Sequence, residues 1–477
     1  MSLKVYNVMS RTKEDFVPLT PGAVKMYACG ITVSGDAHIG HAYQSVVFDV
    51  ITRYFRYFGY DIKYVRNYTD VDDKIIANAA KAGENPIEFA EKYMKQTDKE
   101  MDSLGNARPT IMARATECIN DIIDFVQKLI DKGHAYVSEF GDVYFKLDSF
   151  PEYGKLSHIQ TDKNDTGVRK DVEPGKQNDL DFALWKSAKP GEIAWDSPWG
   201  KGRPGWHIEC SAMNLKYLGE QIDIHGGGRD LVFPHHENEI AQTESLTGKT
   251  FAKYWIHCGL VKINGQKMSK SLNNGILLKD VLAKYDADTI RFALLRNTYA
   301  ADIDITDSLF PESLKHVYKM YTVFVSLMNK DFSNTDKAKT DGKITEIVGE
   351  FEKAMNDNFN TLEVLAAAFG WFNFINAELA KKTTEYDLRA IADKIKELFG
   401  VLNILQQDPI EYVEKVKSSV LKQNGLSVAD IEKAINDRTK AKQDKDWTTA
   451  DSIRSDLLNR GIVLKDGVSG TTWDVNL

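Results

Sequence analysis

The sequence predicts an α/β protein: an open parallel sheet with an inserted domain, followed by an α-helical bundle and a small C-terminal α/β unit. Two stretches predict the sheet. A buried strand at 24–29 precedes a helical period at 42–58, and the same strand–loop–helix order returns at 63–76. We expect residues 67–70 to form a loop at the carboxyl end of the second strand, where parallel sheets bind ligands. The bundle is predicted by the helical period at 308–399, which contains few prolines or glycines.

Changes of pattern divide the 477 residues, which are too many for one ordinary domain. We expect the sheet domain at 1–110 and 201–250, an inserted domain at 111–200, a region with a polar loop at 251–307, the bundle at 308–407, and a linker with the small unit at 408–477.

Local patterns add detail to these domains. The insertion should contain a helix near 115–131, a short strand at 142–147 and an exposed polar loop at 158–179. A strand of the main sheet should return at 221–225. Residues 408–424 indicate a charged linker, and two helices and a hairpin are expected after it.

Composition excludes several classes of protein. Four cysteines, without a CxxC pair, are too few for a disulfide framework. No apolar run reaches the length of about 18 residues that a membrane span needs, and residues 1–14 lack the apolar core of a signal peptide. We therefore expect a cytoplasmic protein. The 61 basic and 69 acidic residues give a net charge of −8, which argues weakly against a nucleic-acid partner, although a local basic face can still bind phosphates.

The string His38-Ile39-Gly40-His41 comes between the first strand and the first helix. At a helix N-terminus, imidazole donors and backbone N–H groups can stabilise the negative charge that grows on ATP phosphates during adenylation. His38 and His41 are three residues apart and can face one side of the first turn. Gly40 lets a nucleotide approach the backbone. Taken alone, such a string is more often a turn followed by a helix cap.

A second string, Lys267-Met268-Ser269-Lys270-Ser271, lies in a polar loop after a strand. Lys267 and Lys270 can close over the β- and γ-phosphates of ATP. Taken alone, this string is usually a solvated surface loop. The two strings together, in this order and context, favour catalysis over both of the simpler interpretations.

Both strings resemble the signatures of class I aminoacyl-tRNA synthetases, and five further segments narrow the resemblance to the cysteinyl-tRNA synthetases. These segments are 27–33 (YACGITV), 67–70 (NYTD), 203–213 (RPGWHIECSAM), 223–228 (DIHGGG) and 233–239 (FPHHENE). The resemblance covers nearly the whole chain. It implies a Rossmann-like catalytic domain that forms cysteinyl-adenylate from L-cysteine and ATP with Mg²⁺, and then transfers cysteine to tRNA(Cys). It also implies a monomer and a tRNA stem contact in the region that carries the second string.

Four residues offer ligands that zinc prefers: two thiols, an imidazole and a carboxylate. Cys29 ends the first strand, Cys210 follows a Pro-Gly turn, and His235 and Glu239 have the i, i+4 spacing of one helix face. From the residues alone, a zinc site and ordinary packing are equally good interpretations. The resemblance implies that these four residues hold one Zn²⁺ per chain, while the other two cysteines match no ligand position.

A zinc ion would explain how cysteine is selected. Serine differs from cysteine by one atom, and apolar contacts discriminate such isosteres poorly. Zinc that coordinates the substrate's thiolate can reject the hydroxyl, because it favours sulfur and lowers the pKa of a thiol. We therefore expect the substrate sulfur as an added zinc ligand and no editing domain.

The resemblance assigns further residues to the small substrates. Gly30, Thr69, Trp206 and His207 are expected at the cysteine, although Trp206 is equally well explained as a core residue. The nucleotide is expected at Ile39, Gly40, Gly226, Gly227, Gly228, Asp230, Met268, Ser269 and Ser271. Glycines allow close approach of the backbone, and an acidic residue suits ribose hydroxyls. The resemblance also implies that an imidazole cluster of His207, His225, His235 and His236 surrounds the cysteine and the zinc.

The last unit resembles the anticodon-binding tail of the family. Trp447 can stack on a base, Asp451 and Asp466 can accept hydrogen bonds from base amino groups, and Lys442 can contact a phosphate. Without the resemblance, packing explains this half of the chain equally well.

Two other functions compete with this interpretation. A related cysteine ligase could use the same adenylate chemistry with an amino-sugar acceptor, but such relatives lack the anticodon tail. A regulatory tRNA-binding protein with an inactive catalytic domain is the other, and the intact strings argue against it. Ser34 and Tyr43 depart from the family pattern beside the first string, which puts local substrate contacts in doubt but not the reaction.

Overall fold

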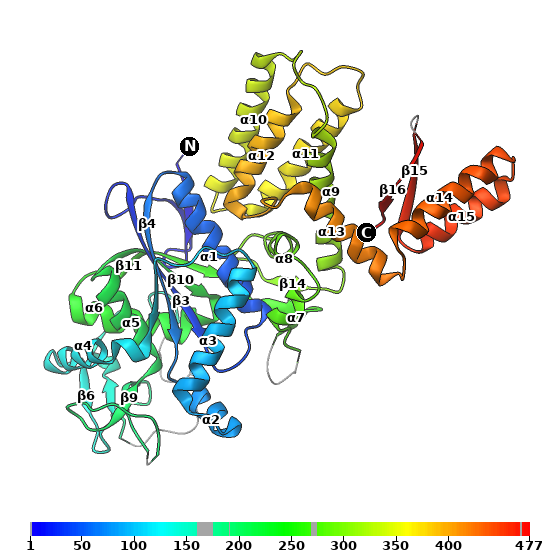
Figure 1. Ribbon diagram of the computed structural model, residues 1–477. Helices are drawn as coiled ribbons and strands as arrows, with labels where there is room; N and C mark the ends of the chain where they lie inside the picture. Colours follow the sequence, from blue (N-terminus) through cyan, green and yellow to red (C-terminus); the bar gives the residue numbers. More distant parts are fainter. Residues whose placement is uncertain (1, 160–174, 190, 269–273, 468–469) are drawn as a thin grey trace. The chain divides into compact units, whose positions relative to one another are not determined.

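The computed structural model describes residues 2–159, 175–189, 191–268, 274–467 and 470–477, and it divides into two compact units (Figure 1). The first unit comprises Met1–Ala287, Leu294–Thr306 and Gly349–Ala366. The second comprises Asp288–Ala293, Asp307–Val348 and Ala367–Leu477.

A five-stranded parallel sheet forms the centre of the first unit. Its strand order is β11-β10-β3-β4-β5, with bounds Ala252–Cys258 (β11), Ile222–Gly228 (β10), Ala23–Thr32 (β3), Asp61–Thr69 (β4) and Ile111–Arg114 (β5). Most residues of β3 and β10 are buried, as expected for strands covered on both faces. The order of β10, β3 and β4 confirms the predicted open α/β sheet.

Helices connect and cover these strands. Helix α1 (Ile39–Tyr57) links β3 to β4, and α2 (Asp73–Ala82) and α3 (Pro86–Ser103) precede β5. On the other side of the sheet, Tyr27 and Val65 join a hydrophobic core with residues of α4 (Ile119–Asp131), α5 (Trp206–Leu218) and α6 (Glu237–Thr247). The sheet is therefore the shared wall of two cores, and residues at its carboxyl edge are placed by both.

The prediction of a loop at 67–70 is wrong for the first three of these residues. Strand β4 continues through Thr69, and only Asp70 lies beyond it. Polar residues are tolerated there because they have partners: the Asn67 side-chain oxygen accepts a hydrogen bond from Gly30 N at 2.9 Å. The Asp70 carboxylate accepts hydrogen bonds from Thr116 N at 3.1 Å and Thr116 Oγ1 at 2.5 Å.

The insertion folds around a four-stranded antiparallel sheet. Its order is β6-β7-β8-β9, with bounds Ala135–Val137, Val143–Phe145, Phe182–Ser187 and Gly202–Pro204. The predicted helix is present, although its first turn, Ala115–Cys118, is a 3₁₀ turn that precedes α4. Most of the expected polar loop at 158–179 lies outside the described residues.

Several short elements complete the first unit. They are the hairpin β1 (Lys4–Asn7) and β2 (Thr12–Asp15), the three-stranded sheet β13-β12-β14 (Gln266–Lys267, Val261–Ile263, Ile303–Ile305) and α7 (Leu278–Leu282). Helix α8 (Ala287–Leu294) follows them in the chain.

The second half of the chain is mainly helical, as predicted. Its helices are α9 (Leu309–Leu327), α10 (Lys337–Asn356), α11 (Thr361–Leu379), α12 (Leu388–Leu402), α13 (Pro409–Gln423), α14 (Val428–Gln443) and α15 (Trp447–Asn459). The hairpin β15 (Ile462–Gly467) and β16 (Gly470–Val475) ends the chain, as expected.

The prediction of a charged linker at 408–424 is wrong, because these residues form helix α13. Asp408 caps the helix by accepting a hydrogen bond from Glu411 N at 2.9 Å, and Pro409 occupies the first helical position. Tyr412 is buried and stacks on Tyr321 with ring centroids 3.9 Å apart. The charged residues of this segment cover one helix face and obscure the apolar positions on the other.

Gly226 offers a test of how tightly the sheet packs beneath α1. An added Cβ would overlap the Phe48 ring and lie 2.7 Å from the Ile256 carbonyl oxygen. Gly226→Ala should therefore lower the free energy of unfolding by about 1–3 kcal/mol in urea titrations. Gly349→Ala is the matched control, because Gly349 is exposed in α10 with open space around it. Gly349→Ala should raise the free energy of unfolding by up to about 1 kcal/mol. Equal effects of the two substitutions would contradict the argument that the sheet has no room for a side chain at Gly226.

Candidate active site and metal centre

A pocket opens where β3, β10 and β11 end, and it brings the two signature strings together. His38, Gly40 and His41 line it, together with Lys267 and Met268. Backbone pairing ties the two segments: Ile39 N donates to Ile276 O, and Leu278 N donates to Ala37 O, each at 2.9 Å. Ser269, Lys270 and Ser271 lie outside the described residues.

The two histidines of the first string form the start of α1. His38 is the N-cap, and its Nδ1 accepts a hydrogen bond from Gly40 N at 3.1 Å. His41 Nδ1 accepts from His38 N at 3.3 Å, and the two rings stack with centroids 3.6 Å apart. The helix-cap and phosphate-binding interpretations are thus compatible, because capping fixes the rings at a helix N-terminus inside the pocket.

The residues expected at the nucleotide separate into two groups. Gly228 and Asp230 line the pocket. Gly226 and Gly227 are buried within β10, where a Cβ on Gly227 would lie 2.9 Å from Leu231. The Ile39 side chain is fully buried. These three positions shape the pocket through packing and do not line it.

Four side chains from separate segments meet beside this pocket. Cys29 lies on β3, where its pairing with β4 is irregular, and Cys210 lies on α5. His235 lies on the π-helical turn Val232–His236, and Glu239 lies on α6, which follows that turn. Their ligand atoms all lie within 4.8 Å of one another, and all four residues are buried. The Cys29 and Cys210 sulfurs are 3.7 Å apart, and His235 Nε2 lies 3.0 Å from Glu239 Oε1. Two thiols, an imidazole and a carboxylate in one buried cluster fit a zinc ion by donor type.

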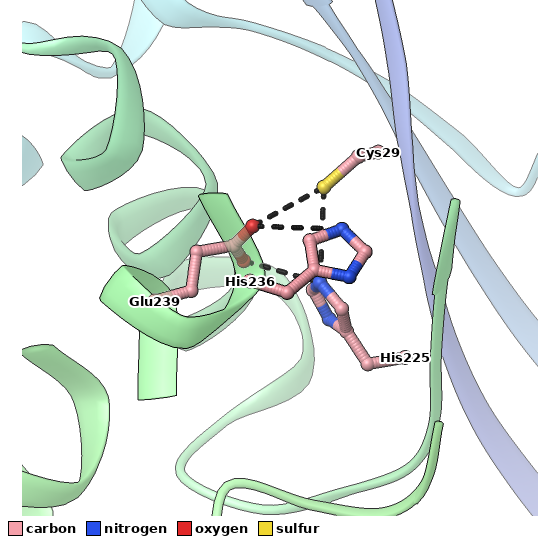
Figure 2. Close-up of side chains that lie close together, drawn as sticks. All are labelled: Cys29, His225, His236 and Glu239. Carbon is pink, nitrogen blue, oxygen red and sulfur yellow. Dashed lines mark hydrogen bonds and ion pairs between the residues drawn. The ribbon is translucent and has the colours of Figure 1, made fainter. Parts of the chain in front are cut away.

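A second set of possible ligands shares Cys29 and Glu239 with the first (Figure 2). It adds His225 and His236, which the resemblance indicated as neighbours of the cysteine and the zinc but not as ligands. His225 Nε2 lies 3.1 Å from Glu239 Oε2 and 3.7 Å from Cys29 Sγ. His236 Nε2 is farther from Glu239, at 3.9 Å. The set with two cysteines is the better match to zinc, since zinc favours thiolates and His225, which lies outside that set, can hold Glu239 through Oε2.

Burial and close charges shift the titration of this cluster. Burial raises the pKa of Glu239, but the nearby His225 and His235 outweigh it and hold that pKa well below its usual range. Burial lowers the pKa of His235, whereas Glu239 and Cys210 together raise it more, to about 10. The hydrogen bond from Cys29 lowers the pKa of Cys210 to about 6, while burial raises the pKa of Cys29. The pair of thiols therefore holds one thiolate at neutral pH.

Three of the four residues expected at the substrate cysteine line the pocket or lie beside the cluster. Gly30 and Trp206 line the pocket, and the Trp206 ring stacks on His235 with centroids 4.3 Å apart. His207 Nδ1 lies 2.9 Å from His235 Nδ1. Thr69 is buried at the end of β4 and does not line the pocket.

The four residues expected at an anticodon lie in the last 36 residues of the chain. Trp447 is 60% exposed and available for stacking, and Asp451 is exposed on the same helix. Asp466 instead accepts hydrogen bonds from Arg438 Nη1 at 2.7 Å and from Lys442 at 2.9 Å. If Asp466 or Lys442 contacts a base, that contact must share or replace these hydrogen bonds.

The sequence matches two family models. The model of the class I (C) tRNA synthetase catalytic domain matches residues 15–315, and the DALR domain model matches residues 350–406. The chain is 46% identical to the cysteine–tRNA ligases of Thermodesulfovibrio yellowstonii and Geobacter sulfurreducens, and each alignment covers 100% of both proteins. Among solved structures, methionyl-tRNA synthetase of Mycobacterium tuberculosis has a similar fold, with a TM-score of 0.58, 14% identity, and 86% and 95% of the two chains covered. No helix in the described part of the chain is long and apolar enough to cross a membrane.

The thiol pair predicts a pH transition in metal-free protein. Because hydrogen bonding stabilises the Cys210 thiolate, ultraviolet thiolate absorbance should rise as the pH increases through about 6. Cys210→Ala should remove this transition. Cys118→Ala should retain it, since burial raises the pKa of Cys118. A thiolate signal that appears only at alkaline pH would contradict the assignment.

Proposed function

This chain belongs to the class I cysteine–tRNA ligases, and we propose that it activates L-cysteine with ATP and transfers it to the 3′ end of tRNA(Cys). One observation carries the site assignment: the pocket with both signature strings adjoins the Cys29–Cys210–His235–Glu239 cluster, and Trp206 contacts both. An amino acid held by its sulfur at the cluster can therefore present its carboxylate to ATP in the pocket.

The residues of the pocket suit adenylate formation. Attack of the cysteine carboxylate on the α-phosphorus releases pyrophosphate and accumulates charge on phosphate oxygens, and Mg²⁺ would accompany the nucleotide. His38 and His41, fixed at the N-terminus of α1, are placed to donate to those oxygens. Lys267 lines the same pocket and supplies positive charge for the leaving group. Gly228 and Asp230 remain the residues proposed for the ribose and adenine.

Selection of cysteine over serine is proposed to depend on the metal cluster. A bound zinc ion would take the substrate's thiolate as a ligand and lower its pKa, which a hydroxyl cannot match. His225 holds Oε2 of Glu239 in place, while Oε1 faces Cys29 and His235, two of the other proposed ligands. The stacked Trp206 ring covers His235 and provides an apolar wall for the short side chain.

The C-terminal unit, with α14, α15 and the final hairpin, is proposed to bind the anticodon. Full-length similarity to cysteine–tRNA ligases supports a tRNA acceptor over an amino sugar. Exposed Trp447 is the best-placed side chain for stacking on an unpaired base. The cytoplasmic location expected from the composition and the monomeric state implied by the resemblance stay predictions.

Replacing one thiol tests the metal centre. Cys210→Ser should lose zinc, measured by metal analysis of the purified protein, and should abolish cysteine-dependent exchange of pyrophosphate with ATP, because zinc binds an alcohol poorly. Cys118→Ala is the matched control, since Cys118 is buried but belongs to neither ligand set. Cysteine activation at the normal rate by zinc-free protein would refute the role of the metal.

Replacing the exposed tryptophan tests the anticodon contact. Trp447→Ala should raise the KM for tRNA by about five- to a hundredfold, since base stacking contributes about 1–3 kcal/mol, and should leave pyrophosphate exchange unchanged. Leu458→Ala on the same helix is the control, because Leu458 is also exposed, at 48%, but cannot stack on a base. An unchanged KM for tRNA in Trp447→Ala would exclude the contact.

A further inference from the structure

A tyrosine in the wall of the active-site pocket has no role in the chemistry described above. Tyr43, which departs from the family pattern beside the first string, lies on α1 and lines the pocket. Its side chain is buried, and its hydroxyl donates a hydrogen bond to the Tyr299 carbonyl oxygen at 2.9 Å. We propose that Tyr43 is a positioning residue, and that this hydrogen bond sets the position of Lys267 relative to the histidines of α1 during adenylate formation. The inference rests on the proposed function, which assigns Lys267 to the leaving pyrophosphate.

The Tyr299 carbonyl oxygen lies where two segments of the pocket wall meet. Besides the bond from the Tyr43 hydroxyl, it accepts a hydrogen bond from Gly259 N at 2.8 Å. A carbonyl oxygen has two lone pairs, and here each has a donor. Gly259 also lines the pocket, and a Cβ there would overlap the Ala301 carbonyl oxygen, so its backbone packs directly on the segment 299–302. Tyr43 therefore fastens the contact between these two backbone segments to α1.

Strand pairing extends this contact to Lys267. Asp302 accepts a hydrogen bond from Leu260 N at 3.0 Å, and strand β14 begins directly after Asp302. Strand β14 pairs with β12 in parallel, and β12 pairs with β13 in antiparallel register, with Lys262 opposite Lys267. Because the backbone hydrogen bonds of a sheet fix its strands relative to each other, a displacement of the segment 299–302 would also move Lys267.

The helix that carries Tyr43 also carries the groups that must act together with Lys267. His38 caps α1, and His41 and Tyr43 follow in its first two turns. The backbone hydrogen bonds of a helix hold these three side chains in fixed relative positions. Charge on the reacting phosphates is stabilised only if the histidines and Lys267 reach them together, and a misplacement of about 1 Å is enough to slow a reaction. The Tyr43 hydroxyl thus relates the first string to the second.

A second connection between the strings limits the effect of losing this hydroxyl. The backbone pairing of 37–39 with 276–278 holds the chain that follows the second string, whereas Tyr43 holds the sheet that precedes it. The Tyr299 carbonyl oxygen would also keep its bond from Gly259 N. Loss of the hydroxyl should therefore leave the fold intact and reduce the precision with which Lys267 is placed.

Tyr43→Phe removes only the hydroxyl and tests the proposal. The kcat of cysteine-dependent pyrophosphate exchange should fall about three- to tenfold, the effect of one hydrogen bond, while the KM for cysteine is unchanged. If Tyr43 acts through Lys267, the same substitution in a Lys267→Ala background should lower kcat by less than about twofold. An equal fractional loss in both backgrounds would show that Tyr43 acts independently of Lys267 and would overturn the proposal, as would an unchanged kcat in Tyr43→Phe alone.

Tyr54→Phe is the matched control. Tyr54 is also buried on α1, and its hydroxyl donates to Asn356 Oδ1 at 3.1 Å, but it does not line the pocket. Its loss should leave pyrophosphate exchange unchanged. An equal loss of kcat in both variants would indicate a general loosening of α1 and would contradict the proposal.

Hydrogen–deuterium exchange of the substrate-free protein tests the positioning separately from the activity. Tyr43→Phe should speed deuterium uptake at Gly259 and across 299–303, because the backbone contact there loses its connection to α1, and Tyr54→Phe should not. Unchanged protection of these amides in Tyr43→Phe would overturn the proposal. If the unaltered enzyme lacks cysteine-dependent pyrophosphate exchange, the proposed function fails, and the deuterium uptake distinguishes that result from failure of the positioning role.

Discussion

A buried carboxylate holds the candidate metal centre together. Glu239 is inaccessible to solvent, and His235, His225 and Cys29 contact it at 3.0, 3.1 and 3.3 Å. A carboxylate in such an interior needs positive or hydrogen-bonding partners, because desolvation strongly disfavours its charge. The neighbouring groups come from β3, β10 and the turn before α6, so satisfying this one charge fixes three elements of the fold relative to each other.

The active-site pocket depends on the same sheet in another way. Its two signature strings are far apart in sequence, yet backbone hydrogen bonds between 37–39 and 276–278 join their segments. Gly30 permits the close approach of β3 to β4, since a Cβ there would overlap the Asn67 carbonyl oxygen. The chemistry therefore rests on backbone contacts as much as on the side chains that line the pocket.

Trp206 links the parts of the site. Its ring stacks on His235 of the buried cluster, and it lines the active-site pocket. The preceding residue, Gly205, leaves the N-terminus of α5 without a side-chain cap. In the proposed function, this helix start contributes to the selection of the amino acid.

The sequence by itself determined the α/β class and the helical second half, and it singled out the four residues that the structure brings into one buried cluster. These features follow from local periodicity and from rare residue types whose chemistry is specific, such as cysteine and histidine beside turns. It did not reveal helix α13, because charged residues on an exposed face obscured buried positions such as Tyr412. Only the tertiary structure showed that Gly226 and Gly227 pack within the sheet, that Asp466 is held by Arg438 and Lys442, and that His225 contacts Glu239. Those outcomes depend on which distant segments come together, and a linear pattern carries no record of contacts between strands and helices that are far apart in the chain.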